Sequence, residues 1–176
     1  MLDLDQETIK KFQILFNNKQ YSSLEFEINF LGDIKEQHPK VIMLYALCKT
    51  LNPMSKENDL LEASHFYEEV YSVNKKKVPR DLNYLDPIIN MIFISLKTKI
   101  YDSVLPLVLE AFKDNPKNEK IIEGLALINA KLFNFSDAVK YYQLLFKINP
   151  KRSADRITFL AGLNYVSGIT QEYYLS

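Results

Sequence analysis

The feature that most constrains the fold of this 176-residue chain is a motif that occurs twice. The first copy runs from Tyr101 to Pro116 and the second from Phe135 to Pro150, so both ends of the motif repeat after 34 residues. A period of about 34 is that of a helix–turn–helix repeat, whose single unit cannot bury its own apolar face and stacks on its neighbours. The sequence therefore predicts a row of paired helices.

The rest of the chain carries the same kind of pattern in a less regular form. It has only 4 glycines, most of its 7 prolines fall between segments of apolar periodicity, and hairpin turns of the Asn-Gly or Asp-Gly type are absent. We therefore expect an all-α fold, a right-handed superhelical stack of antiparallel helix pairs with about nine to ten helices. The pairs are expected at residues 7–39, 40–75, 85–116 and 119–150, followed at 153–176 by a capping helix and the start of a possible continuation.

The spacing of apolar residues also predicts where each helix begins and ends. The expected bounds are 7–16, 22–37, 40–50, 60–73, 87–98, 102–115, 119–132, 137–148 and, for the capping helix, 154–166. Pro39 is expected to stop the second helix, and His38 to meet its terminal carbonyls. Ser136 is a candidate N-cap of the helix at 137–148, because its hydroxyl oxygen can accept a bond from an unpaired backbone N–H.

Small and aromatic residues recur at matching positions in the second helices of the pairs. The second pair carries Ala63, Tyr67 and Val70, and the fourth pair repeats this order with Ala138, Tyr142 and Leu145. The arrangement resembles the tetratricopeptide repeat family, well over residues 85–150, less well over 40–74 and weakly over 7–39. The tryptophan and glycine of the family's first helix are absent, and Ile92 stands where the family has a small residue.

A second resemblance lies beyond the repeats. Leu163-Asn164-Tyr165 and Thr170-Gln171-Glu172 look like the join between the repeats and the catalytic region in bacterial O-linked N-acetylglucosamine transferase-like (SPINDLY-type) proteins. The alternative is an ordinary capping helix, followed by Thr170 as the N-cap of another helix. The resemblance implies that the catalytic residues lie outside this chain. It also implies a row of peptide-gripping asparagines, whose positions fall on Asn90 and Gly124, so one of the two is an asparagine.

Residue patterns typical of enzymes and metal sites are missing. The sequence has neither a glycine-rich phosphate loop nor a nucleophile elbow, and its single cysteine and 2 histidines cannot supply a zinc site. Cys48 lies in an apolar run and is expected to be a small core residue, while His65 is expected to pair with Glu69 four residues on. We therefore predict that this chain alone is not an enzyme and holds no cofactor and no metal.

Charge and hydropathy restrict the partners. The 22 basic and 22 acidic residues give a formal net charge of +0, whereas nucleic-acid binding relies on a basic surface. No apolar run approaches the roughly 18 residues of a membrane helix, and the acidic N-terminus is unlike a secretory signal. The sequence therefore predicts a cytoplasmic protein that binds neither nucleic acid nor membrane.

These observations favour a non-catalytic scaffold that binds a peptide or a partner protein on the concave face formed by the first helices. The repeat register gives the expected groove residues, which are Asp86, Ile89, Asn90, Phe93, Lys97, Lys120, Glu123, Leu127 and Lys131. The alternative is a substrate-presenting N-terminal repeat region of a protein O-glycosyltransferase whose catalytic part is absent from this chain. Self-association into a homo-oligomer is a further expectation, since short repeat arrays have open ends.

Overall fold

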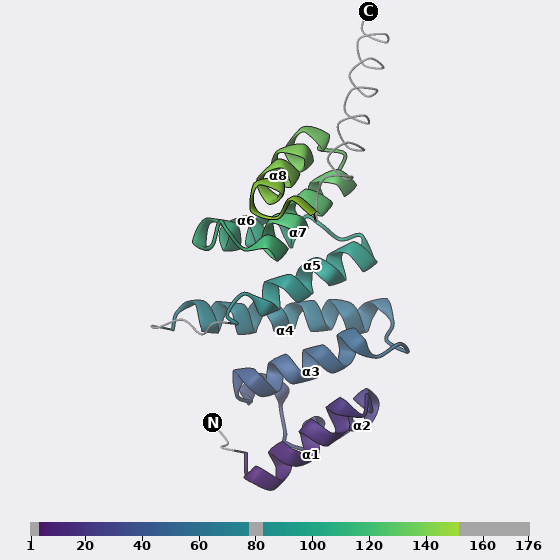
Figure 1. Cartoon of the computed structure of the whole chain (residues 1–176). Helices are drawn as coiled ribbons and strands as arrows, with labels where there is room; N and C mark the ends of the chain where they lie inside the picture. The colour runs from purple at the N-terminus through teal and green to yellow at the C-terminus, as the bar shows by residue number, and fades with distance from the viewer. Residues whose placement is uncertain (1–3, 78–82, 152–176) are drawn as a thin grey trace, which may run out of the picture. The chain divides into compact units, whose positions relative to one another are not determined.

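The computed structural model describes residues 4–77 and 83–151, which fall into two compact units, residues 1–98 and 99–176 (Figure 1). The described residues form eight α-helices and one 3₁₀ helix: α1 (Gln6–Asn17), α2 (Tyr21–Asn29), η1 (Ile34–Glu36), α3 (Pro39–Leu51), α4 (Glu57–Lys75), α5 (Asp86–Thr98), α6 (Leu105–Asp114), α7 (Glu119–Lys131) and α8 (Phe135–Ile148). The all-α prediction is confirmed. The helix expected at 154–166 lies outside the described residues.

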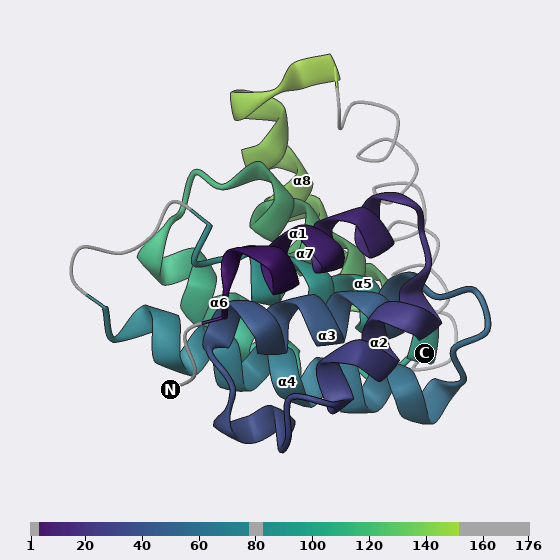
Figure 2. The same ribbon diagram turned by 90° about the horizontal axis from the view of Figure 1, so that it is seen from below.

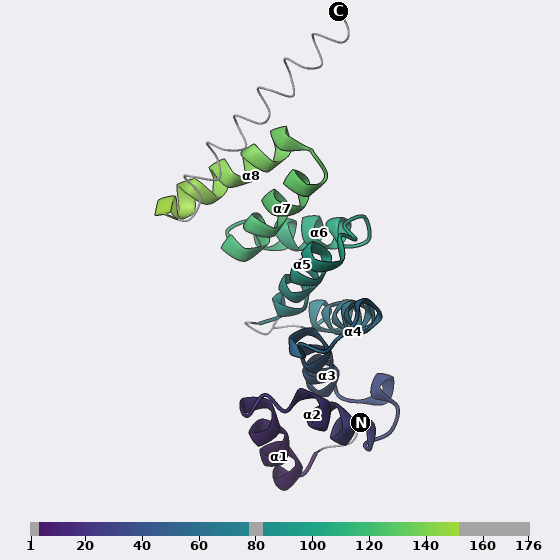
Figure 3. The ribbon, with the colours of Figure 1, turned by 90° about the vertical axis from the view of Figure 1, so that its right-hand side faces the viewer.

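The first unit is a stack in which each helix from α1 to α5 packs on the next one in the sequence. In Figure 2 α3 runs alongside α4, and in Figure 3 α4 lies on one side of the unit with α1 and α5 toward the other. Apolar side chains of these helices form the core of the unit. Leu24 and Ile28 of α2 and Ala63 and Tyr67 of α4 are completely buried. Small alanines at such positions let neighbouring helices approach closely.

The second unit comprises α6, α7 and α8, with α7 and α8 packed together and α6 against α7. Its core is a cluster of buried side chains, with Phe112 and Tyr141 packed against it edge to face at a ring-centroid distance of 5.7 Å. The buried members are Ile122, Ala126, Ala138, Tyr142 and Leu145. Ala138, Tyr142 and Leu145 are the residues that the sequence analysis places at matching positions in the second helix of the fourth pair.

The bounds of the helix expected at 22–37 are wrong. The helix α2 ends at Asn29, and Gly32 then adopts a φ of +104°, a conformation that favours glycine because it has no Cβ. The chain resumes as the 3₁₀ helix η1, whose N-cap Asp33 accepts a bond from the backbone N–H of Lys35 at 3.0 Å. Leu31 and Ile34 continue the helical apolar spacing, which is why the pattern alone extends the helix too far.

Two predicted helix caps are also wrong. Pro39 begins α3 rather than stopping a helix, and His38 is the N-cap, its Nδ1 accepting from the backbone N–H of Lys40 at 3.2 Å. A proline fits the first helical position, because its missing N–H would have no partner there. Ser136 lies within the first turn of α8, whose N-cap is Asn134.

Three smaller differences concern a helix start, an ion pair and the third helix pair. The helix expected from residue 102 begins at Leu105, and His65 lies 4.0 Å from Glu68 rather than pairing with Glu69. The pair expected at 85–116 is divided between the units, since α5 belongs to the first and α6 to the second. The pairing of α5 with α6 stays a prediction.

A buried lysine joins three helices of the first unit. The ammonium of Lys49, on α3, lies 2.9 Å from a carboxylate oxygen of Glu25 on α2 and 3.0 Å from one of Glu62 on α4. Lys49 as a whole is 5% exposed. Its ammonium also lies 5.0 Å from the centre of the Tyr45 ring. Burial lowers the pKa of Lys49, but hydrogen bonds to the two carboxylates outweigh burial and raise that pKa above its usual value. This network ties the first helix pair to the second.

Candidate partner-binding surface

The five groove residues expected in the third pair lie along α5, where none of them is buried. Asp86, Ile89 and Asn90 are half-buried, while Phe93 and Lys97 are exposed. The Lys97 ammonium lies 5.1 Å from the centre of the Phe93 ring, which is a cation–π contact. This face of α5 is therefore a mixed apolar and polar surface within the first unit.

The other four expected groove residues lie on α7, in the second unit. Lys120 and Lys131 are exposed, Glu123 is half-buried, and half-buried Leu127 packs against the core cluster of that unit. The two groups thus belong to separate units, and their union in one groove stays a prediction. Gly124, the second position of the expected asparagine row, is buried in α7.

The same register continues onto α3, where the sequence analysis named no groove residue. Ile92 of α5 and Ala46 of α3 are both buried at the middle of their helices, 46 residues apart. The same shift carries the groove positions of α5 onto a row of α3 side chains that are exposed or half-buried: Lys40, Met43, Leu44, Leu47 and Leu51. This shift exceeds the 34-residue period, so the repeat register alone does not lead to them.

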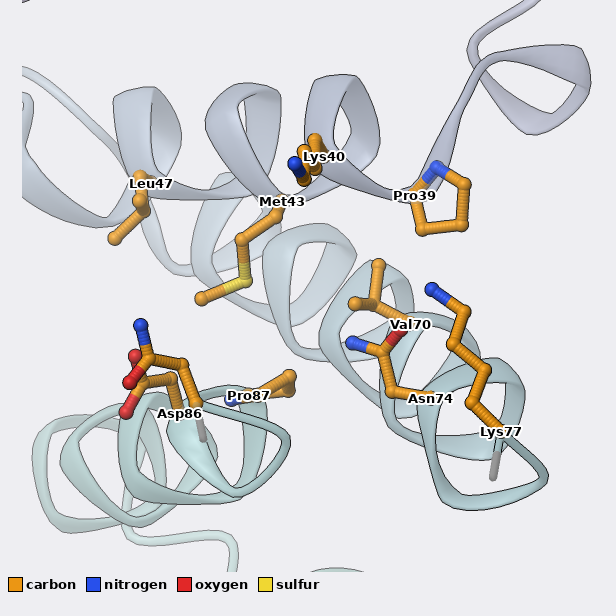
Figure 4. A pocket seen from close by; sticks show the side chains of 10 residues that line it. Pro39, Lys40, Met43, Leu47, Val70, Asn74, Lys77, Asp86 and Pro87 are labelled. Carbon is orange, nitrogen blue, oxygen red and sulfur yellow. The ribbon is translucent and has the colours of Figure 1, made fainter. Parts of the chain in front are cut away.

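The first cavity, of about 670 Å³, lies between α3, the C-terminal end of α4 and the start of α5. Met43 projects from α3 toward the side where Asp86 lies, and Asn74 and Lys77 lie on the other side of the cavity (Figure 4). The remaining lining residues are Pro39, Lys40, Leu47, Val70, Asn83 and Pro87. Its floor is apolar, and its rim carries both basic and acidic groups.

The second cavity, of about 540 Å³, lies between α1 and α3. Ile9 and Gln13 line it from α1, and each stands 34 residues before a residue of the α3 row, Met43 and Leu47. Its other lining residues are Leu4, Phe12, Phe16, Asn17, His38, Lys40, Val41 and Leu44. The repeat period therefore relates the α1 and α3 sides of the second cavity, and the two cavities together lie along α1, α3 and the start of α5.

Charge is distributed unevenly around the two cavities. Lys40 lines both of them, while Asp86 contributes a carboxylate to the first cavity and the lining residues of the second include no acid. In the part of the chain that the structure describes, no ion pair engages the exposed Lys40 ammonium. Because the Nδ1 atom of His38 accepts a hydrogen bond, its neutral imidazole carries the proton on Nε2. The second cavity is thus apolar with a basic rim.

The described residues show no grouping suited to catalysis by a metal or a thiolate. Over residues 4–77 and 83–151, no cluster of three or more His, Cys, Asp or Glu side chains is suited to a metal ion. Cys48 is completely buried, and its burial raises the pKa of the thiol to about 12, with a smaller contribution from Glu25. A thiol that stays protonated is a poor nucleophile. Helices long and apolar enough to span a bilayer are also absent from these ranges.

Comparison with known proteins gives one sequence relative and several structural neighbours. No family model matches the sequence. A UDP-N-acetylglucosamine--peptide N-acetylglucosaminyltransferase of Giardia intestinalis is 27% identical over 148 residues, which cover 84% of this chain. The chain spans only 10% of that relative's length.

Solved structures of MamA match the fold over most of the chain. The structure of MamA AMB-1 has a TM-score of 0.68 at 12% identity, covering 89% of this chain and 80% of MamA. That of the MamA RS-1 ArsTM double mutant has a TM-score of 0.74 at 10% identity, covering 97% and 90%. The chain therefore has a tetratricopeptide-like α-solenoid fold, as its 34-residue period predicts, and it is similar in sequence to a small part of a protein N-acetylglucosaminyltransferase.

Proposed function

We propose that this chain is a non-catalytic scaffold that binds a segment of a partner protein along the first helices α1, α3 and α5. The observation that carries the proposal is the pair of cavities that open on this row of helices. Their apolar floors suit side chains of a bound segment, and their polar rims suit its backbone and charged groups. The fold supports the same function, because stacked helix pairs present extended surfaces to peptides and partner helices.

A selection of random short peptides on the full chain tests the proposal. Met43→Glu places a carboxylate on the apolar floor of the first cavity, so selected peptides should lose affinity by about tenfold or more. Fluorescence anisotropy of labelled peptides measures the loss. The α5 face is tested in the same way by the double variant Asn90→Ala, Phe93→Ala.

The matched control is Met54→Glu, since Met54 is 81% exposed and lines neither cavity. Peptides should bind this variant with an affinity within about twofold of wild type. Equal affinity for the Met43→Glu, Met54→Glu and double variants would show that this row of helices does not hold the ligand. The absence of any selected peptide would count against the proposal as well.

A second candidate function follows from the sequence relative. We propose as the alternative that the chain presents protein substrates as the repeat region of an O-glycosyltransferase, on the strength of the 27% identity with the Giardia enzyme. The test is the mass of the protein isolated from its own cells, together with transfer of N-acetylglucosamine to a peptide. A native protein of 176 residues without transferase activity would exclude this alternative.

A further inference from the structure

We propose that the second cavity, between α1 and α3, selects peptides in which an acidic side chain lies beside a large apolar one. The apolar side chain would enter the cavity, and the carboxylate would pair with Lys40 at its rim. This inference rests on the proposed scaffold function and specifies the chemistry of its ligand.

The apolar half of the inference comes from the walls. Phe12 and Val41 close the floor and are about 4% and 5% exposed, while Ile9, Phe16 and Leu44 remain half-buried. The half-buried side chains retain accessible apolar surface, and covering such surface contributes about 25 cal/mol per Å². A volume of about 540 Å³ is ample for an aromatic or branched aliphatic side chain and its neighbours.

The charged half comes from the rim. The ten lining residues include Lys40 and His38 but no aspartate or glutamate. No carboxylate of the lining would therefore attract a basic ligand or repel an acidic one. Lys40 is the second residue of α3, where the unpaired N–H groups of a helix start also favour negative charge. The Nε2–H of His38 adds a hydrogen-bond donor.

The first cavity offers a contrast within the same molecule. It shares Lys40 and adds Lys77, but Asp86 also lines it, so an acidic ligand there meets a carboxylate as well as two ammonium groups. The two cavities therefore differ in the presence of this carboxylate, although both have apolar floors and at least one lysine. The lining without a carboxylate, on which the proposed acidic preference rests, belongs to the second cavity.

The test uses the full chain and the same random peptide selection. Sequencing should show Asp or Glu enriched within a few positions of Phe, Leu, Ile or Met. For a selected peptide, changing its acidic residue to the neutral amide should weaken binding by about fivefold to tenfold, the effect of a partly exposed charge pair. Fluorescence anisotropy at low and high salt measures both this loss and its screening.

Two variants of the protein examine the rim. Lys40→Glu reverses the charge without threatening the fold, because an acid is favourable in the first turn of a helix. This variant should bind the selected acidic peptide more weakly than wild type does. It should regain affinity for a version of that peptide in which the acidic residue is changed to lysine. Gln13→Glu is isosteric, and it should lower affinity by adding a carboxylate to the wall of the second cavity.

The control is Lys117→Glu, at another exposed lysine, which precedes α7 in the other unit, and it should leave affinity unchanged. If peptides are selected and Met43→Glu or the Asn90→Ala, Phe93→Ala variant weakens them, but neither acids are enriched nor Lys40→Glu matters, this inference is overturned while the scaffold function stands. If no selected peptide responds to any variant along α1, α3 and α5, both fail. Restoration by the lysine-substituted peptide supports the rim pair directly.

Discussion

Lys49 shows how a charged residue can hold a helical stack together. Its ammonium is shielded from water, yet it meets the carboxylates of Glu25 and Glu62 from the helices on either side of α3. Removing one partner of a buried charge pair costs more than removing an exposed pair, because the remaining charges lose their compensation. Sequence reading places lysines on the surface by default, so this contact could not be predicted from the spacing alone.

Lys49→Met should therefore destabilise the chain by about 2 kcal/mol, a value below that of a fully buried pair because Glu25 and Glu62 can rehydrate. Urea denaturation followed by circular dichroism measures the change. Lys11→Met is the matched control: Lys11 pairs with Glu27 at the surface, and its loss should cost less than about 1 kcal/mol. Equal losses in the two variants would contradict a special role for Lys49.

Cys48 makes stability depend on pH in the alkaline range. Burial raises its thiol pKa from 9.0 to about 12, so between these values the unfolded chain loses a proton that the folded chain keeps. The contribution is fully present below pH 9 and decreases as the pH rises. Between pH 8 and 10, wild type should lose about 1.4 kcal/mol more stability than Cys48→Ala. Identical alkaline profiles of the two proteins in urea titrations would contradict this assignment.

At the scale of the elements, apolar spacing places the helices well and local backbone chemistry decides their ends. The helices α5, α7 and α8 begin and end within two residues of the predicted positions. The predicted end of α2 is wrong because Leu31 and Ile34 continue the apolar spacing, while Gly32 between them adopts a non-helical backbone conformation. A glycine at a helix end is a recognised stop signal, and giving it more weight than the stripe would have corrected the prediction.

Gly32→Ala should destabilise the first unit by about 1–2 kcal/mol, because a side chain is strained at a φ of +104°. The substitution meets no steric obstacle, since an added Cβ would lie 4.0 Å from the nearest atom, the side-chain nitrogen of Gln37. Thermal or urea denaturation gives the cost. Ser23→Ala, on the exposed side of α2, is the control and should be neutral or slightly stabilising. An unchanged midpoint for Gly32→Ala would mean that the turn relaxes.

The candidate surface was only partly predictable, because its prediction depends on the sequence spacing between successive helices. The register identified Asp86 and its neighbours on α5, because two clear repeats fix the phase of that helix. The corresponding side chains of α3, such as Met43 and Leu47, were missed because the long connections before and after α4 widen the spacing from 34 to 46 residues. Cavities depend on how side chains fill the gaps between helices, and this packing is not encoded in periodicity.

At the scale of the molecule, each of the two units has buried core residues of its own. Leu24 lies in the core of the first unit and Leu145 in that of the second, and both are completely buried. Repeat arrays are stabilised mainly by contacts between neighbours, so damage to one unit should stay largely local. The grouping into units does not follow the sequence repeats, since α5 and α6 are assigned to different units.

Leu145→Ala should cost about 3 kcal/mol and accelerate amide hydrogen exchange in α7 and α8, while α1 and α2 keep their protection. Leu24→Ala is the reciprocal variant and should expose the amides of α1 to α3 instead. Mass spectrometry of proteolytic peptides after exchange resolves the two patterns. Uniform acceleration along the whole chain in both variants would show a single cooperative unit.

Self-association remains a prediction at this scale. The end of the first unit carries Phe26 and Phe30, which are 61% and 76% exposed and stack edge to face at 5.0 Å. Sedimentation velocity at several concentrations should reveal an oligomer that weakens when Phe30 is changed to Ala. A single monomeric boundary at all concentrations would remove the expectation.

The position of Lys40 on the ridge between the two cavities has a thermodynamic consequence. One ammonium can neutralise only one carboxylate, so acidic groups bound in both cavities would compete for Lys40, and the first cavity has the further ammonium of Lys77. Occupancy of either cavity by an acid should then lower the affinity of the other for an acid, and linkage requires the two effects to be equal. The surface would thereby favour one continuous segment with a single central acid over two separate acidic ligands, a form of negative cooperativity set by one side chain.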